Sequence, residues 1–219
     1  DPATVKSAVA GADIVINLVG ILYERPGSKA FEHIHVEGAR TVAEAAREAG
    51  ARHFVQMSAI GADADSPSAY ARSKARGEAA VKDAFPDASI VRPSIVFGPG
   101  DGFFNRFAAL SGLTPALPLI GGGQSRFQPV FVGDVAEAVA RAVDGKIAGG
   151  KVYDLGGPEV LTFRECMQLM LEVIERTRYL VTVPWWLADL QASVLEFVRE
   201  LQVVESELGV PQTTVELAR

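Results

Sequence analysis

Two side chains in the stretch SAYARSK, Tyr70 and Lys74, have the types and spacing for proton-transfer chemistry. On a helix, residues four apart lie on one face, so the phenol and the ammonium would point the same way. A phenol has a pKa of about 10, and a neighbouring ammonium favours the phenolate and lowers that pKa. The same ammonium can donate hydrogen bonds to a ribose. The pair therefore predicts an acid/base or a nucleotide holder, with a merely packing tyrosine as the alternative.

Alternating strands and helices would position this pair. Apolar runs predict buried strands at 12–20 and 52–59 and a third strand at 89–98. Alanine-rich, capped segments predict helices at 31–50, ending at Gly50, and at 68–85. Strands that alternate with helices of this length form right-handed βαβ units and a parallel sheet. We expect an α/β fold with a Rossmann-type parallel sheet, and its 68–85 helix carries both candidate residues.

The chain changes character after Gly98, where it becomes rich in Gly, Pro and aromatic residues. We expect a partial nucleotide-binding core at 1–98 and a C-terminal part at 99–219 that forms a small mixed lobe. That part returns a helix at 134–145, with Asp134 as its N-cap, and a strand at 151–157 to the core.

Two further features are expected in the C-terminal part. Thr162 and Glu165 form the sequence pattern of a capping box. Residues 184–201 form an amphipathic helix with two tryptophans and an acidic polar side. This helix either packs on its own domain or docks on a partner protein, since its acidic side disfavours an anionic membrane.

Composition excludes several classes of function. The net charge of −6 argues against a nucleic-acid binder, which normally has a basic surface. The single cysteine, Cys166, excludes an internal disulfide and is expected to be a core or semi-buried thiol. No apolar run reaches about 18 residues, so we expect no transmembrane segment. His33 and His35 would point apart on a helix, so no metal site is expected.

Five segments, in order along the chain, carry a resemblance to a known family. They are INLVGIL, SAIGADADSPSAYARSKARGEAAV, AFPDASIVRPSIVFGPGDGFFNRFAAL, GGGQSRFQPVFVGDVAEAV and YDLGGPEVLTFRE. Together they resemble the extended or atypical short-chain dehydrogenases/reductases. Within that family they are most similar to the nucleotide-binding accessory subunits of respiratory complex I and their alphaproteobacterial relatives. The resemblance extends over residues 1–184 and implies that NADP(H) or NAD(H) is the cofactor.

The resemblance also implies roles for individual residues. Tyr70 and Lys74 would bind the nicotinamide ribose. The strand end at Val19 and Gly20 would pass close to a cofactor ribose, unless Gly20 serves only a turn. Three residues would lie beside the nicotinamide ring: Pro93, Ser94 and Ile95. The alternative for Pro93 is that it only ends the strand. Arg126 and Gln128 would line the substrate side.

The chain departs from the pattern of catalytic relatives at two positions. The Ser or Thr that polarises a substrate carbonyl aligns with Ala59, although a shift of one residue would give that catalytic role to Ser58. His35 stands where catalytic relatives often have asparagine. The family's glycine-rich pyrophosphate turn would lie upstream, so we expect about 60 further residues there. The choice between NAD and NADP therefore stays open.

The leading hypothesis is an NAD(P)(H)-binding accessory subunit of respiratory complex I in which the nucleotide is mainly structural. Complex I subunits would be its partners. The protein would be cytoplasmic. A more specific location is a peripheral position on the cytoplasmic face of the bacterial inner membrane. One rival is an NAD(P)-dependent oxidoreductase or epimerase with Tyr70 and Lys74 as catalytic residues. The other is a nucleotide-sensing regulatory protein.

Overall fold

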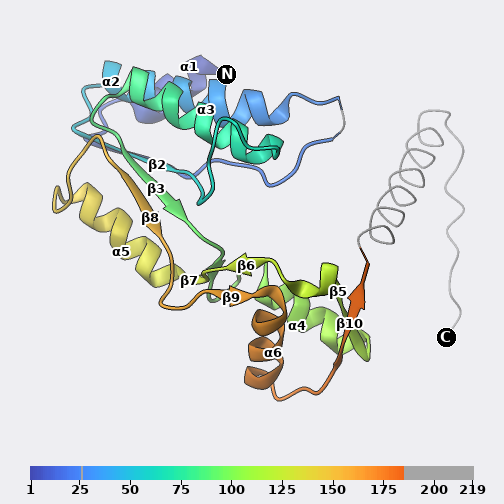
Figure 1. Cartoon of the computed structure of the whole chain (residues 1–219). Coiled ribbons are helices and arrows are strands. Elements are labelled where there is room, and N and C mark those ends of the chain that lie inside the picture. The colour runs from blue at the N-terminus through green and yellow to red at the C-terminus, as the bar shows by residue number, and fades with distance from the viewer. Residues whose placement is uncertain (26, 185–219) are drawn as a thin grey trace, which may run out of the picture. The chain divides into compact units, whose positions relative to one another are not determined.

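The computed structural model describes residues 1–25 and 27–184, and Figure 1 shows their arrangement. The chain divides into two compact units. The first consists of Asp1–Arg106 and Arg126–Leu161, and the second of Phe107–Ser125 with the described residues from Thr162 onward. Apart from Pro184, the amphipathic helix predicted at 184–201 lies outside the described residues.

A four-stranded parallel sheet runs through the described part of the first unit. Its strands, in spatial order, are β1 (Ile14–Asn17), β2 (His53–Met57), β3 (Ser89–Pro93) and β8 (Val152–Leu155). Each strand is parallel to its neighbours. The predicted α/β fold with a Rossmann-type parallel sheet is therefore confirmed. The first strand is shorter than the predicted 12–20, because the Asn17 side chain accepts a hydrogen bond from the Val19 backbone N–H and the ladder ends there.

Helices cover both faces of this sheet, as Figure 1 shows. Helices α2 (Ala39–Glu48) and α3 (Ala69–Ala84) lie over one face and α5 (Val132–Val143) over the other, whereas α1 (Pro2–Val9) packs on α2 and η1 (Glu32–Gly38) on α3. Successive strand residues point to opposite faces, so Phe54 packs with Val81 and Phe85 of the α2–α3 layer. Its neighbour Val55 packs with Val91 and a buried alanine of α5. Two apolar clusters therefore fix β2 and β3 between the helical layers.

The first strand is covered on one face only. Val15 is buried in the cluster under α2 and α3, whereas Ile14 and Ile16 are 36% and 43% exposed. The expectation of a fully buried strand was therefore wrong for the second face. Helix α5 packs on β2 and β3, and β1 lies at the edge of the described sheet beyond β2.

The helix predicted at 31–50 forms, but its first part, η1, is a π-helix. Gly77 of α3 lies against this segment, where an added Cβ would overlap the His35 carbonyl oxygen. The predicted end at Gly50 is confirmed. Gly50 has φ +77°, a conformation that other residues rarely adopt, and its N–H donates to the carbonyl of Arg47 at 3.0 Å.

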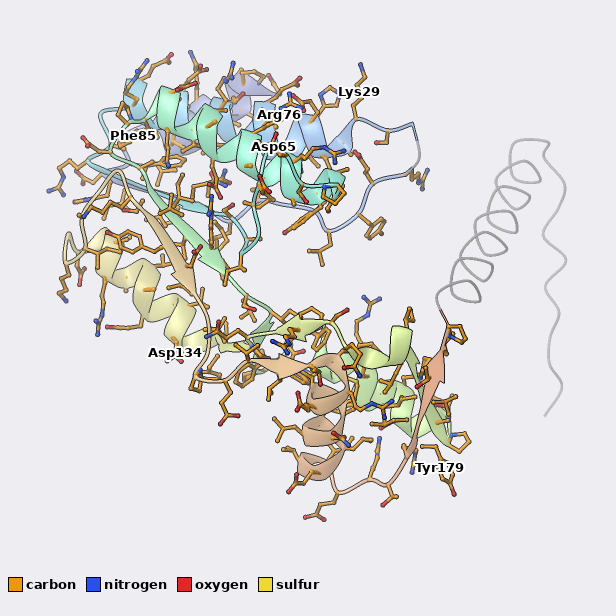
Figure 2. All side chains as sticks on the ribbon, viewed as in Figure 1. Lys29, Asp65, Arg76, Phe85, Asp134 and Tyr179 are labelled. Carbon is orange, nitrogen blue, oxygen red and sulfur yellow. The ribbon has the colours of Figure 1, made fainter. Side chains whose placement is uncertain are left out.

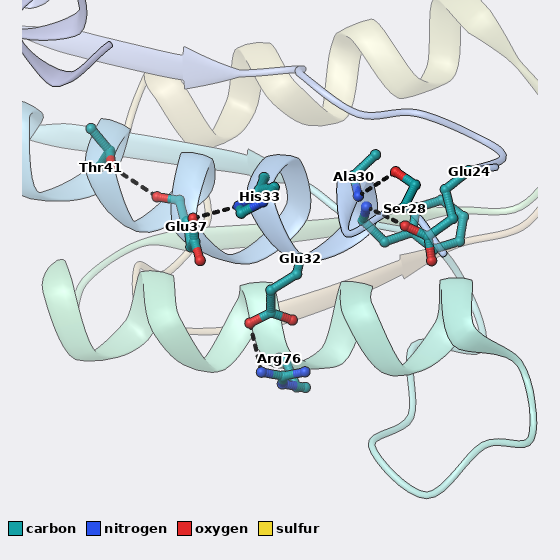
Figure 3. Close-up of polar contacts among 9 residues, drawn as sticks. Glu24, Ser28, Ala30, Glu32, His33, Glu37, Thr41 and Arg76 are labelled. Carbon is teal, nitrogen blue, oxygen red and sulfur yellow. Dashed lines mark hydrogen bonds and ion pairs between the residues drawn. The ribbon is translucent and has the colours of Figure 1, made fainter. Parts of the chain in front are cut away.

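One ion pair joins this helix to α3 and another pair lies within the helix, as Figure 3 shows. Arg76 of α3 pairs with Glu32 at 2.6 Å. His33 pairs with Glu37 at 2.8 Å, one turn along the same helix. The His33–Glu37 pair is exposed and the Arg76–Glu32 pair is partly exposed, so each contributes little to stability, about 0–1 kcal/mol. His33 therefore lies on the outer side of the helix.

The α5 helix begins earlier than predicted. It starts at Val132, with Phe131 in the N-cap position, so the prediction that Asp134 caps it was wrong. Asp134, labelled in Figure 2, lies in the first turn. A carboxylate in the first turn still faces the positive end of the helix dipole. Aspartate is therefore favoured both at the N-cap and in the first turn, and the sequence does not distinguish the two positions.

The described part of the second unit combines a small sheet with one well-capped helix. Strands β5 (Ala116–Ile120) and β10 (Tyr179–Val183) run parallel to each other. Helix α6 (Phe163–Val173) starts with the predicted capping box of Thr162 and Glu165, which is confirmed. Cys166 is fully buried in this helix, as expected.

The remaining elements are short, apart from one helix at the boundary of the units. They are β4 (Val96–Phe97), α4 (Phe104–Leu113), η2 (Gly121–Gly123), β6 (Arg126–Phe127), β7 (Val130–Phe131) and β9 (Leu161–Thr162). Among the described residues, no helix is both long and apolar enough to cross a membrane. The same residues contain no cluster of side chains that could hold a metal ion.

Candidate functional site

Lys74 and Tyr70 project from the first turns of α3. Ser68 caps this helix by accepting a hydrogen bond from the Ala71 N–H at 3.4 Å. The Lys74 side chain runs back to β2, where its ammonium donates to the carbonyl oxygen of Met57 at 3.0 Å. Lys74 is only 8% exposed, and burial lowers the pKa of its ammonium, against a smaller opposite effect from Glu78. The lysine is thus fixed at the carboxyl end of β2.

The Tyr70 ring packs in an aromatic group. It lies edge-on to His35, with ring centroids 5.6 Å apart, and edge-on to Phe31 at 5.8 Å. Its hydroxyl makes no hydrogen bond to the described residues, so it is available to a ligand. Burial raises the pKa of this phenol. The predicted lowering by Lys74 was therefore wrong for this structure, because desolvation of the phenolate dominates.

Gly20 lies beside the Lys74 ammonium. A Cβ placed on Gly20 would lie 3.8 Å from Lys74 Nζ and 3.5 Å from His35 Nε2. Tyr70 also contacts His35, so the structure brings together four of the residues singled out in the sequence. Val19 precedes them in the chain and is 63% exposed. The turn after β1 and the Lys74 ammonium of α3 therefore meet at Gly20.

A buried polar chain connects this turn to Lys74. The Val19 N–H donates to Asn17 Oδ1 at 3.2 Å, and Asn17 Nδ2 donates to Gln56 Oε1 at 2.9 Å. Gln56 Nε2 then donates to the Met57 carbonyl at 3.0 Å, the same oxygen that accepts from Lys74. Asn17 and Gln56 are each 4% exposed. The ends of β1 and β2 are therefore tied into one unit with the lysine.

Sequence reasoning missed Asn17 and Gln56 as members of the site. Both interrupt otherwise apolar strand runs, and they are direct partners in the register of β1 with β2. A buried polar residue in the middle of an apolar strand needs a hydrogen-bond partner, which is the signal that could have found them.

His35 joins the same site from η1. Its Nε2 accepts from the Ile21 N–H at 3.1 Å, and its Nδ1 lies 2.8 Å from Ser73 Oγ on α3. The Phe31 ring stacks on it with centroids 5.2 Å apart. Burial and, less strongly, Lys74 lower the pKa of the imidazole. His35 is therefore neutral at pH 7 and fastens the turn after β1 to α3.

Ser58 is engaged elsewhere. Its hydroxyl donates to Glu78 on α3, and Arg92 of β3 binds the same carboxylate through Nε at 2.8 Å and Nη2 at 2.6 Å. Ser58 and Glu78 are each 5% exposed. A serine hydroxyl that donates to a buried carboxylate cannot donate to a substrate carbonyl at the same time.

Pro93, Ser94 and Ile95 lie at and just beyond the carboxyl end of β3. Their hydrogen bonds are structural: the Pro93 carbonyl accepts from the Ile60 N–H, and the Ile95 carbonyl from the Val130 N–H. Ser94 Oγ accepts from the Gln128 N–H at 3.2 Å. In open parallel sheets, ligands bind outside the carboxyl ends of the strands, the end at which these residues and Lys74 lie.

The Gln128 side chain is also used within the fold. Its amide donates to the Gly157 carbonyl at 2.7 Å. Arg126 is exposed. Their predicted place on the substrate side stays a prediction.

Residues 1–156 match the family model described as the NAD dependent epimerase/dehydratase family. The chain belongs to this family. The resemblance to extended short-chain dehydrogenases/reductases drawn from the sequence is thereby confirmed.

The similar curated proteins include proteins named as subunits of a mitochondrial NADH dehydrogenase. The "NADH dehydrogenase [ubiquinone] 1 alpha subcomplex subunit 9, mitochondrial" of Arabidopsis thaliana is 38% identical over 199 residues, 90% of this chain and 49% of that protein. The Rattus norvegicus protein of the same name is 35% identical over 178 residues, 81% and 47% of the two chains. A ceramide reductase of Caulobacter vibrioides is 38% identical over 135 residues, 62% and 42%. The chain spans about half the length of these subunits.

Solved structures share the fold. A dTDP-glucose 4,6-dehydratase from Streptomyces venezuelae, with NAD bound, has a TM-score of 0.73 at 22% identity, covering 84% of this chain and 64% of that one. A dTDP-4-dehydrorhamnose reductase from Bacillus anthracis, in complex with NADP, has a TM-score of 0.73 at 19% identity, covering 84% and 70%. At this identity the likeness establishes the fold alone.

Proposed function

We propose that this chain is the nucleotide-holding part of an accessory subunit of respiratory complex I and that its nucleotide is mainly structural. The engagement of Ser58 carries the proposal. Its hydroxyl is held by Glu78, which Arg92 holds in turn, so the group that would polarise a substrate carbonyl is committed to the fold. The similarity to subunit 9 of the mitochondrial enzyme supports complex I as the assembly.

The residues around Gly20 fit NADP(H) or NAD(H). Lys74 has three N–H donors and uses one on Met57, which leaves two for ribose hydroxyls. The Tyr70 hydroxyl is available beside it. Gly20 has no side chain to fill the space next to the ammonium, so a ribose can approach the backbone. Val19 would flank the same ribose, and Pro93, Ser94 and Ile95 the nicotinamide ring.

A second candidate is an NAD(P)-dependent oxidoreductase. The available Tyr70 hydroxyl favours it, as does the similarity to a ceramide reductase. The bound nicotinamide would supply the hydride. Because burial raises the pKa of Tyr70, the phenol would keep its proton at pH 7 and serve as an acid rather than a base. Tyr70 would give that proton to the carbonyl oxygen, with Lys74 holding the ribose.

The proposed partners are subunits of complex I, and the proposed location is peripheral, on the cytoplasmic face of the bacterial inner membrane. The test is to solubilise native membranes gently, separate the assemblies by size and extract the nucleotide. Co-migration with complex I, with one NADP(H) or NAD(H) per subunit that does not turn over, would support the accessory subunit. A free protein whose NAD(P)H is oxidised by an added carbonyl substrate would refute it and favour the oxidoreductase.

A further inference from the structure

His35 is the one side chain that hydrogen-bonds to both the turn after β1 and helix α3 among the described residues. The Ile21 N–H can only donate, so Nε2 of His35 must be its acceptor. In the neutral ring the proton therefore lies on Nδ1, which donates to Ser73 Oγ. Ser73 Oγ in turn donates to the Tyr70 carbonyl at 2.7 Å. One tautomer satisfies the whole chain.

Protonation of His35 would break this chain at a defined point. A second proton on Nε2 would face the Ile21 N–H, so two donors would oppose each other at a distance that is now 3.1 Å. His35 is 4% exposed, so the new N–H has little access to water. Gly77 also lets α3 close over the His35 backbone, which limits the movement of the ring. The turn at Gly20–Ile21 is therefore the part that must move away from the ring when His35 is protonated.

The surrounding charges oppose the imidazolium. Lys74 on α3 lies near the ring, and its charge disfavours a second cation. The Ile21 backbone and, more weakly, Glu24 in the loop that follows the turn favour the cation, but burial and Lys74 outweigh them, and the pKa of His35 is lowered. Tyr70 faces the ring edge-on and stays neutral at pH 7, because burial raises its pKa. On the ring's own helix, His33 and Glu37 pair with each other, and Glu32 pairs with Arg76.

We propose that His35 is a positioning residue that holds the Gly20–Ile21 turn in its nucleotide-binding form only while its imidazole is neutral, so that acidification loosens the nucleotide. This proposal rests on the proposed nucleotide site. The device is a proton-linked latch: Nε2 accepts from the turn, Nδ1 donates to α3, and one added proton removes the first bond.

The test uses the whole protein with its bound nucleotide. The release rate of NADPH, followed by its fluorescence, is measured from pH 5 to pH 8. Losing one hydrogen bond predicts release that is roughly 2- to 10-fold faster at the acid end. In His35→Gln the side-chain amide oxygen can still accept from Ile21 and does not titrate, so its release should stay flat with pH. His33→Gln, on the exposed side of the same helix, should behave like the wild type.

A second readout separates this latch from the function. In the nucleotide-free protein, amide exchange at Ile21 should accelerate as His35 protonates, in the wild type and in His33→Gln but not in His35→Gln. If this occurs and no nucleotide ever binds, the latch stands and the proposed function fails. If nucleotide binds but its release is independent of pH, slows in acid, or changes equally in His35→Gln, the latch is refuted while the function stands.

Discussion

The ammonium of Lys74 and the backbone carbonyl of Met57 are hydrogen-bonded across 3.0 Å, from the first turns of α3 to the last residue of β2. This one bond determines where the lysine can act. The Met57 oxygen also accepts from Gln56, so the lysine is anchored to a polar chain that reaches the turn at Val19. A lysine held in this way is a fixed donor and not a flexible surface charge.

Lys74→Met should abolish firm nucleotide retention and leave the fold intact. The change removes charged donors to the ribose, which predicts affinity weaker by about 10- to 100-fold. The free energy of unfolding should change by less than about 1 kcal/mol, because Met57 keeps its bond from Gln56 and a buried charge is removed. Titration calorimetry and urea unfolding measure the two quantities. Lys82→Met, in the last turn of α3, is the control and should alter neither.

Tyr70→Phe should unfold at nearly the same urea concentration as the wild type, within about 0.5 kcal/mol. The hydroxyl has no partner among the described residues, and the ring keeps its contacts with Phe31 and His35. Tyr70→Ala removes those contacts from a half-buried position and should cost about 2–3 kcal/mol. Equal losses in the two variants would show that the hydroxyl has an internal partner.

Glu78→Gln should be among the more destabilising single changes at the site, by about 3 kcal/mol. The amide cannot neutralise Arg92, whose side chain is 24% exposed and whose other carboxylate, Asp154, is 3.9 Å away. The matched control is Glu137→Gln, which breaks an exposed ion pair with Arg141 on α5 and should cost less than about 0.5 kcal/mol. Chemical denaturation of both variants measures the two costs. Similar costs would contradict a structural role for the buried contacts of Glu78 with Ser58 and Arg92.

The pH dependence of stability should contain a contribution from His35. Its pKa is lowered in the folded state, so the unfolded chain binds the proton more readily. The contribution is fully present above the unfolded value of about 6.5 and is lost as the pH falls below it. Unfolding free energies of the wild type and His35→Gln between pH 5 and pH 8 should diverge only on the acid side. Divergence on the alkaline side would reverse the sign and refute the assignment.

Asn17 and Gln56 should show strong coupling in a double-mutant cycle. Gln56→Leu leaves the Asn17 amide without its buried acceptor, at a cost of about 1–3 kcal/mol, and Asn17→Leu has a similar effect on Gln56. The double variant should cost much less than the sum, because two apolar side chains can replace the pair. Additive costs would show that the two amides act independently.

Much of the fold could be predicted because its signals are local. Apolar runs located β1, β2 and β3, and the glycine at position 50 and the capping box at Thr162 fixed helix boundaries. The π-helical turn could not be predicted, since it depends on the approach of α3 at Gly77 to the His35 backbone. The exposed face of β1 was missed because the sequence does not show how far α5 extends over the sheet.

The site was predictable in its residue types and less so in its connections. The pairing of Tyr70 with Lys74 on one helix follows from their spacing. The Lys74 acceptor is a backbone carbonyl, which carries no signature in the sequence. The direction of the Tyr70 pKa depends on burial, and the engagement of Ser58 by Glu78 bridges twenty positions. Those facts are tertiary and become visible only once the chain is folded.

Cys166 has a practical consequence. It is the chain's single thiol, it is fully buried in α6 of the second unit, and burial raises its pKa. The thiolate is the reactive form, so alkylating reagents can modify it only when that unit opens. Cys166 is therefore a built-in probe of local unfolding in the second unit. The rate of labelling counts the transient openings of the second unit alone, without any engineered probe, and that rate can be compared with and without nucleotide.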